Sequence, residues 1–245
     1  GAKARRKKAN RSQNGSNQDL VQGTNDEATL SKYSCLRRGY YEDPYLDAFV
    51  SRPASRSALI NRGYYTRVMV VRDLMRGFLG LPGYHVAAEQ VFYGNVPTGA
   101  EGKANGQEVF KALPDVRELQ VVSFGCGFDT FAFVLGDELV ERGWKGCLRY
   151  IEADFGGVVE RKRACILHNP PAATYFGEVD AAEDAALHLA AMRTWAGGAG
   201  RMEYRLLALD LADLPAVEKG LHGAGFDPAL PTLFFAECVL NYIDP

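Results

Sequence analysis

Long apolar runs and paired cysteines are both scarce in this chain of 245 residues. No apolar stretch approaches the roughly 18 residues that a membrane-spanning helix needs, and no hydrophobic signal segment follows the basic start. The five cysteines lie far apart and form no Cys-x-x-Cys pair. Such a set predicts reduced thiols and argues against a zinc site. We therefore expect a cytoplasmic or nuclear protein with no bound metal and no membrane partner.

Charge is distributed unevenly along the chain. The 28 Lys and Arg and the 30 Asp and Glu give a formal net charge of −2. Residues 1–20 carry six of the basic groups and one acid, so the remaining 22 basic and 29 acidic residues leave residues 21–245 with a balance of −7. We interpret residues 1–20 as a disordered basic tail, the one segment whose charge favours nucleic acid.

Residues 21–80 are expected to form a helical extension. Thr24 and Glu27 have the spacing of a capping box, so a helix is expected over residues 25–38, with Gly39 as its C-terminal cap. This pattern places the start of ordered structure near residue 21.

A second helix is expected over residues 57–79. Its apolar residues recur at three- and four-residue steps and predict one core-facing stripe: Ile60, Tyr64, Val68, Val71, Met75 and Phe78. Residues 81–117 then become rich in Gly, Pro, Asn and Ala with weak periodicity, which is typical of an insertion.

From residue 118 onward, strand and helix patterns alternate. The expected strands are residues 119–124, 148–154, 204–209 and 232–237, and the expected helices are residues 129–142, 158–168 and 214–224. We interpret residues 169–202 as a second irregular or helical insertion. The alternation predicts an α/β fold with a doubly wound parallel sheet. Because the last strand would be an exposed edge, we expect further strands downstream and expect the isolated chain to aggregate or to be molten.

Candidate binding residues follow each expected strand. Gly125 and Gly127 come after the first, Asp154 ends the second, Asp210 follows the third and Glu237 ends the fourth. Ligands of doubly wound sheets bind at the carboxyl ends of the strands. The glycines would let a ligand approach the backbone closely, Asp154 could accept bonds from two ribose hydroxyls, and Asp210 could reach an adenine edge.

The first turn argues against a dinucleotide. Thr130 occupies the place of the third glycine, and Asp129 before it would repel a pyrophosphate, which disfavours an NAD-linked oxidoreductase. A nucleoside that carries a cation and no phosphate suits the acidic strand ends better, and S-adenosylmethionine is such a molecule. Its carboxylate needs a cation, which Arg67 or Lys32 could supply. Taken alone, both are more consistent with ordinary surface cations.

Several motifs resemble those of the leucine carboxyl methyltransferases. They occur in order along residues 21–245 and include Ile60-Asn61-Arg62-Gly63-Tyr64-Tyr65-Thr66-Arg67, Gly125-Cys126-Gly127-Phe128-Asp129-Thr130, Glu152-Ala153-Asp154-Phe155 and Ala236-Glu237-Cys238-Val239-Leu240. The resemblance implies a class I, Rossmann-like methyltransferase domain over residues 21–245 that uses S-adenosyl-L-methionine. It also implies cofactor-binding residues: Lys32 and Arg67 as cations, Gly125 in the loop, Asp154 at the ribose, Asp210 and Leu211 near adenine, and Glu237 at the ammonium group.

The family methylates the C-terminal leucine carboxylate of protein phosphatase 2A catalytic subunits, so this tail is the expected partner of a monomeric enzyme. Two alternatives remain: a close relative methylates a carboxylate during wybutosine synthesis on tRNA, and the chain could be an inactive nucleoside-binding scaffold. A C-terminal carboxyl, with a pKa of about 3.5, is ionised at neutral pH and needs no general base. Tyr242 could orient it. None of the four histidines is expected at a strand end: His85, His168, His188 and His222.

Overall fold

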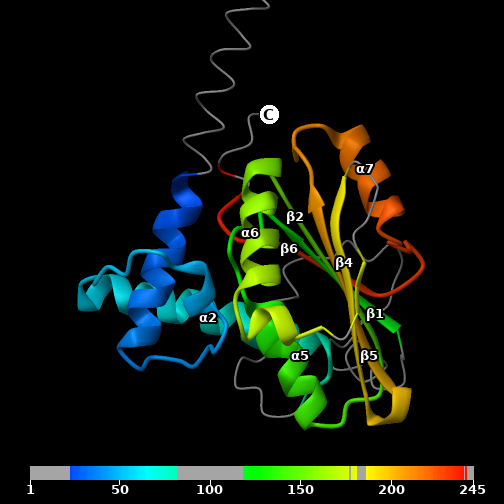
Figure 1. Cartoon of the computed structure of the whole chain (residues 1–245), viewed down its shortest axis with the longest axis horizontal. Coiled ribbons are helices and arrows are strands. Elements are labelled where there is room, and N and C mark those ends of the chain that lie inside the picture. The colour runs from blue at the N-terminus through cyan, green and yellow to red at the C-terminus, as the bar shows by residue number, and fades with distance from the viewer. Residues whose placement is uncertain (1–22, 82–117, 177, 181–185, 240, 242–245) are drawn as a thin grey trace, which may run out of the picture.

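The computed structural model describes residues 23–81, 118–176, 178–180, 186–239 and 241. Residues 23–81, which we call the helical lobe, lie beside an α/β body formed by the later residues (Figure 1). The predicted basic tail, nearly all of the predicted 81–117 insertion and Tyr242 lie outside the described residues.

The body contains a six-stranded sheet with the order β3-β4-β5-β2-β1-β6. Its strands are β1 (Glu118–Phe124), β2 (Gly146–Asp154), β3 (Glu178–Asp180), β4 (Leu187–Trp195), β5 (Gly200–Ala208) and β6 (Thr232–Ala236). β1 pairs in parallel with β2 on one side and with β6 on the other, and β2 pairs in parallel with β5. These four strands confirm the predicted parallel core, and their order reverses between β1 and β6.

The interpretation of residues 169–202 as irregular or helical is wrong. This segment contains the antiparallel strands β3 and β4, and β5 already begins at Gly200 rather than at Tyr204. The sequence here is rich in alanine, which favours helices, and so it obscures the alternation that buries Leu189 and Ala191. Pairing with β5 outweighs that local preference.

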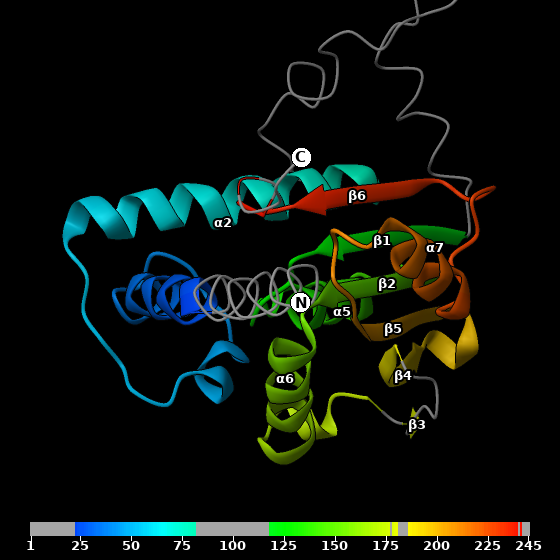
Figure 2. The ribbon, with the colours of Figure 1, turned by 90° about the horizontal axis from the view of Figure 1, so that it is seen from above.

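Helices cover both faces of the sheet (Figure 2). α5 (Phe131–Glu141) and α6 (Gly156–His168) cover one face, and α7 (Leu214–Gly223) covers the other. The larger core includes Phe133 of α5 and Tyr150 and Tyr204 of the sheet, whereas α7 contributes Leu221 to a smaller core on the opposite face. Short 3-10 turns complete the described elements: η1 (Leu46–Phe49), η3 (Ala172–Thr174) and η4 (Ala196–Gly198).

The helical lobe consists of a helix over residues 23–37, then η1, then α2 (Ala58–Phe78). Gly39 ends the first helix as predicted, with a φ of 75° and an N–H that donates to Leu36 O at 2.8 Å. The stripe predicted along α2 is confirmed except at its first residue, because Tyr64, Val68 and Val71 also pack in apolar clusters. Met75 and Phe78 are buried in the core, but Ile60 is 43% exposed because the first turns of α2 extend past the body.

The described helices include none that is both long enough and apolar enough to cross a membrane. Within the same residues, His, Cys, Asp and Glu side chains form no group of three or more that could hold a metal ion.

Candidate functional site

Two cations and two acids meet where the helical lobe contacts the carboxyl ends of β1 and β6. Lys32 Nζ lies 2.9 Å from Asp129 Oδ2 and 3.0 Å from Glu237 Oε2. The Arg67 guanidinium donates to the other oxygen of Glu237 and lies over the Tyr64 ring, 5.4 Å from its centroid. We call Lys32, Arg67, Asp129 and Glu237 the four-charge cluster.

The cluster draws its members from separate parts of the chain. Lys32 comes from the first helix and Arg67 from α2, whereas Asp129 follows β1 and Glu237 follows β6. Figure 2 shows the arrows of β1 and β6 pointing toward the helical lobe. The cluster therefore lies at the reversal of strand order, which is the usual ligand site of a doubly wound sheet.

Mutual attraction keeps three members of the cluster ionised despite their burial: Lys32, Arg67 and Asp129. Burial alone would lower the pKa of Lys32, but attraction to Asp129 and Glu237 outweighs this effect and raises that pKa above its ordinary range. Burial alone would raise the pKa of Asp129, but Lys32 and Lys162 lower that pKa to about 2. Burial would likewise lower the pKa of Arg67, and Glu237 raises it. All three groups are thus charged near neutral pH.

The turn after β1 is held open by glycine and anchored by two side chains. Gly125 and Gly127 have φ values of 64° and 49°, which L-residues with side chains rarely adopt. The Gly127 N–H donates to Asp154 Oδ2 at 2.7 Å. The next N–H, that of Phe128, donates to Asn25 Oδ1 at 2.9 Å. Asp154 thus lies against the turn, with its second carboxylate oxygen accepting the N–H of the residue that follows it.

The predicted adenine-side residues lie at the adjacent strand end. Leu209 N–H donates to Asp154 O at 2.8 Å, which brings the segment after β5 beside the end of β2. Asp210 is exposed there and accepts the N–H of Ala212 at 3.0 Å, while Leu211 packs against the smaller core. The structure therefore places every predicted site residue that it describes at or against one edge of the sheet.

A narrow cavity lies behind the four-charge cluster, and three members of the cluster line it. Its enclosed space measures about 20 Å³, room for about one water molecule. The wall also contains the buried pair of Arg72 Nη2 and Asp43 Oδ2, 2.9 Å apart, and Thr130 donates to the same Asp43 oxygen at 2.7 Å. The bond from Thr130 joins the start of α5 to the helical lobe, and Arg72 holds Asp43 within the lobe.

Sequence reasoning missed two residues of this site. Asp129 is expected from the sequence to repel a pyrophosphate, yet in the structure its carboxylate binds Lys32. Asn25 is expected only to begin a helix, yet its side chain holds the glycine turn. The signal for Asp129 was available, because an acid in the first strand-end turn would face any cation brought to that edge.

The expectation about histidines is wrong for one residue. His188 is the second residue of β4, which begins beside the carboxyl end of β5, where Leu187 pairs with Leu207. The antiparallel hairpin that brings it there was not predicted. His168 and His222 lie on the exposed surfaces of α6 and α7, and His85 lies outside the described residues. Among the cysteines, burial raises the pKa of the Cys126 thiol well above its ordinary value, so that thiol stays protonated.

Known proteins resemble this chain over most of its length. A model of the leucine carboxyl methyltransferase family matches residues 107–245. The "Leucine carboxyl methyltransferase 1 homolog" of Arabidopsis thaliana is 34% identical over 94% of this chain and 55% of its own length. The "tRNA wybutosine-synthesizing protein 4" of Homo sapiens is 35% identical over 92% of this chain and 27% of its own length. The "Probable leucine carboxyl methyltransferase 1" of Caenorhabditis briggsae is 31% identical over 91% of this chain, which spans 55% of that protein.

Proposed function

Because this chain belongs to the leucine carboxyl methyltransferase family, we propose that it transfers a methyl group from S-adenosylmethionine to a carboxylate. The substrate that we propose is the C-terminal leucine α-carboxylate of a protein phosphatase 2A catalytic subunit, which would become a methyl ester. The chain spans about half the length of its leucine carboxyl methyltransferase relatives, and the proposal concerns the whole protein. The four-charge cluster at the reversal of strand order is the observation that carries it.

The donor set of the site fits the proposed cofactor. The amino-acid end of S-adenosylmethionine carries one carboxylate and one ammonium group, and the cluster offers two cations and two acids. Lys32 and Arg67 would hold the carboxylate, and Glu237 would hold the ammonium group. Asp154 would hold the ribose hydroxyls, and the segment at residues 210–211 would lie near the adenine. When bound, this cofactor supplies a methyl group activated by a positively charged sulfur.

The chain's own residues then act by positioning. The acceptor carboxylate has an ordinary pKa of about 3.5, so it is already a nucleophile at neutral pH and no side chain has to remove a proton. Alignment of two reactants in a water-poor site can lower a barrier by roughly 7–11 kcal/mol. The ion pairs of the cluster and the hydrogen bond from Thr130 to Asp43 hold the two sides of this site together. The buried thiol of Cys126 takes no part, because it stays protonated.

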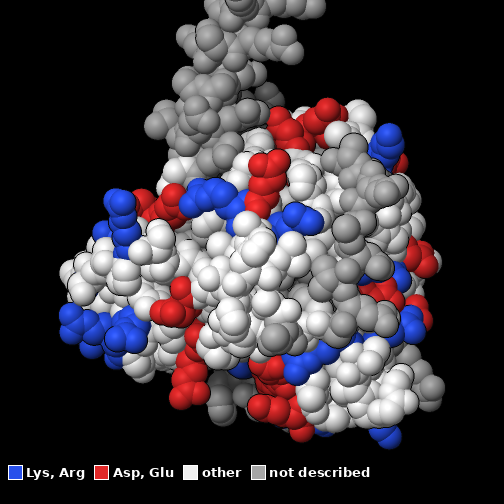
Figure 3. Space-filling view, in the orientation of Figure 1, with Lys and Arg blue, Asp and Glu red and all other residues white. Residues whose placement is uncertain are grey.

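A second candidate is methylation of a carboxylate on a modified tRNA. The human wybutosine relative is 35% identical to this chain, almost the same identity as the plant leucine carboxyl methyltransferase homolog. The basic residues 1–20 also favour RNA, whereas the balance of −7 in residues 21–245 opposes the phosphate contacts that dominate such binding. On the face shown in Figure 3, acidic and basic side chains are interspersed over both the lobe and the body. We therefore favour a protein substrate.

The test uses the full-length protein with isotope-labelled S-adenosylmethionine. It compares an intact phosphatase catalytic subunit, the same subunit without its terminal leucine, and wybutosine-pathway tRNA. Base-labile label on the intact subunit alone supports the proposal, and label on the tRNA alone selects the second candidate. Cofactor binding without transfer to either would instead indicate a nucleoside-binding scaffold. An Arg67→Ala variant should lose transfer, while Arg62→Ala, an exposed cation on the same helix, should keep it.

A further inference from the structure

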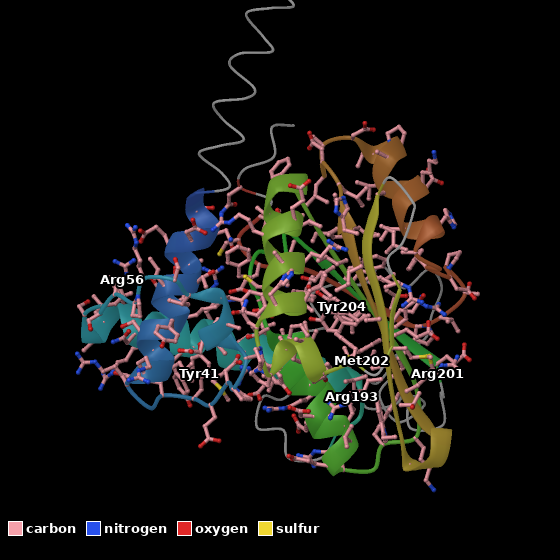
Figure 4. All side chains as sticks on the ribbon, viewed as in Figure 1. Tyr41, Arg56, Arg193, Arg201, Met202 and Tyr204 are labelled. Carbon is pink, nitrogen blue, oxygen red and sulfur yellow. The ribbon has the colours of Figure 1, made fainter. Side chains whose placement is uncertain are left out.

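A fully buried ion pair lies beneath the turn that carries Asp129. Lys162 of α6 and Glu152 of β2 are both 0% exposed, and Lys162 Nζ lies 2.5 Å from Glu152 Oε2. Tyr204 of β5, labelled near the centre of the molecule in Figure 4, donates its hydroxyl to the same oxygen. The other oxygen, Glu152 Oε1, is buried and has no hydrogen-bond partner among the described residues.

This pair is a poor source of stability. Removing two charges from water carries a large desolvation cost, and apolar residues of similar volume often replace such pairs without loss of stability. The unpartnered Glu152 oxygen adds a further cost, because a buried acceptor without a donor has lost its bonds to water. We therefore ask which neighbouring groups the pair holds in position.

The buried pair contacts one member of the four-charge cluster. Lys162 Nζ also donates to the backbone oxygen of Asp129 at 2.8 Å. The carboxylate of the same residue binds Lys32 through Oδ2 at 2.9 Å, and its Oδ1 accepts the N–H of Phe131 at 2.8 Å. Lys162 thus holds the backbone of the residue whose carboxylate holds Lys32.

Charges of alternating sign link the core to the site as a result. The series runs from Glu152 to Lys162, through Asp129 to Lys32, and then through Glu237 to Arg67. All five links of this series are ion pairs or hydrogen bonds to a charged group, which are stronger than hydrogen bonds between neutral groups. The first two members lie wholly inside the body, out of reach of any ligand.

We propose that Lys162 is a positioning residue: its buried ammonium group, neutralised by Glu152, fixes the turn at residues 127–131 so that Asp129 presents Lys32 to the amino-acid end of the cofactor. The consequence for the cofactor depends on the proposed function, but the effect on the turn does not. Lys162 itself touches neither cofactor nor substrate.

The main test variant is Glu152→Met/Lys162→Met, which removes both charges and keeps similar side-chain length. A single Lys162→Met variant would leave Glu152 buried without its cation, and the double variant avoids that penalty. The matched control is Tyr204→Phe, which removes a buried hydrogen bond to the same carboxylate but leaves the bond between Lys162 and Asp129 intact.

Two measurements are made on each full-length protein. The first is native-state hydrogen exchange of the amides of residues 127–131, compared with amides of β1 and α6. The second is the Kd for S-adenosylmethionine by calorimetry. We expect the double variant to lose protection at residues 127–131 by about tenfold or more relative to β1, and to bind the cofactor about tenfold or more weakly. The Tyr204→Phe variant should keep both quantities within about twofold.

Two results would overturn the proposal. One is unchanged protection of residues 127–131 relative to β1 in the double variant. The other is an equal loss of protection throughout the body, which would show that the pair acts only on global stability. If the wild-type protein fails to bind S-adenosylmethionine, the proposed function fails, and the exchange data still decide whether Lys162 positions the turn.

Discussion

At the scale of single residues, each described cation of the candidate site already has an acidic partner. Lys32 binds two carboxylates and Arg67 binds one, and these contacts keep all the groups close together before any ligand arrives. The carboxylate of a zwitterionic ligand can take the place of an acid beside the cations, and its ammonium group can take the place of a cation beside the acids. No buried charge is then left unpaired. The cluster is therefore suited to an amino-acid moiety rather than to a simple anion.

At the same scale, methyl transfer is expected to need no histidine. His188→Ala and His168→Ala should each retain the methyl-transfer rate within about threefold, because the acceptor is ionised without help from a base, and a base typically contributes 10²–10⁴-fold where one is needed. Initial rates across pH 6–8 check this expectation. His188 is the stricter test of the two, because it lies beside the carboxyl end of β5. A hundredfold loss in a folded His188→Ala protein would contradict the base-free scheme.

At the scale of elements, the turn after β1 depends on glycine for two separate reasons. Gly125 has a φ of 64°, and a Cβ added there would clash with Val239 Cγ2. Gly143 after α5 has a φ of 60°, but an added Cβ would meet no atom within 4 Å. A side chain would strain the backbone at both positions, but only at Gly125 would it also clash with a neighbour beside the site.

We therefore expect Gly125→Ala and Gly143→Ala to differ. The left-handed backbone should cost about 1–2 kcal/mol in each, and Gly125→Ala should lose more because Val239 or the turn must shift. Chemical denaturation measures the free energy of unfolding, and calorimetry measures the affinity for S-adenosylmethionine. Affinity should fall in Gly125→Ala alone. Equal losses of stability with unchanged affinity in both variants would show that the turn does not shape the site.

Much of the element pattern could be predicted from the sequence. The four parallel strands and the helices between them follow from short apolar runs and periodic stripes, and glycine marks the cap at Gly39 and the turn at Gly125. The β4 strand could not be predicted, because its alanine-rich sequence favours a helix and only pairing with β5 makes it a strand. The pairing of Asp129 with Lys32 depends on tertiary contact across 97 residues, which local patterns do not encode.

At the scale of the whole molecule, buried charges join the helical lobe to the body. Lys32 and Arg67 bind acids at two strand ends, and the Asp43 carboxylate of the lobe accepts the hydroxyl of Thr130 beside the first turn of α5. Such pairs stabilise the folded state only while their acids stay ionised. The attachment of the lobe should therefore depend on pH in the acidic range.

The lowered pKa of Asp129 defines the pH range over which its stabilising contribution is lost. Its pKa is about 2 in the folded protein against an ordinary 3.8, so its stabilising contribution is complete above about pH 4 and is lost as the pH falls toward 2. Across that window, the stability difference between the wild type and Asp129→Asn should shrink by about 2 kcal/mol. Urea denaturation at pH 5, 4, 3 and 2.5 tests this. Parallel pH profiles for the two proteins would show that Lys32 does not stabilise the ionised carboxylate.

The most direct test of the central claim, that the four-charge cluster binds the amino-acid end of S-adenosylmethionine, compares two ligands. Calorimetry on the full-length protein measures the Kd for S-adenosylhomocysteine and for methylthioadenosine, which lacks the amino-acid end. We predict that the wild type prefers S-adenosylhomocysteine by at least about 100-fold, since two charged contacts of 1.5–3 kcal/mol separate the ligands. A Lys32→Met/Arg67→Ala variant should lose most of that preference, because the carboxylate has no cation left, and should bind methylthioadenosine as the wild type does. Equal affinity of the wild type for both ligands, or an unchanged preference in the variant, would contradict the account.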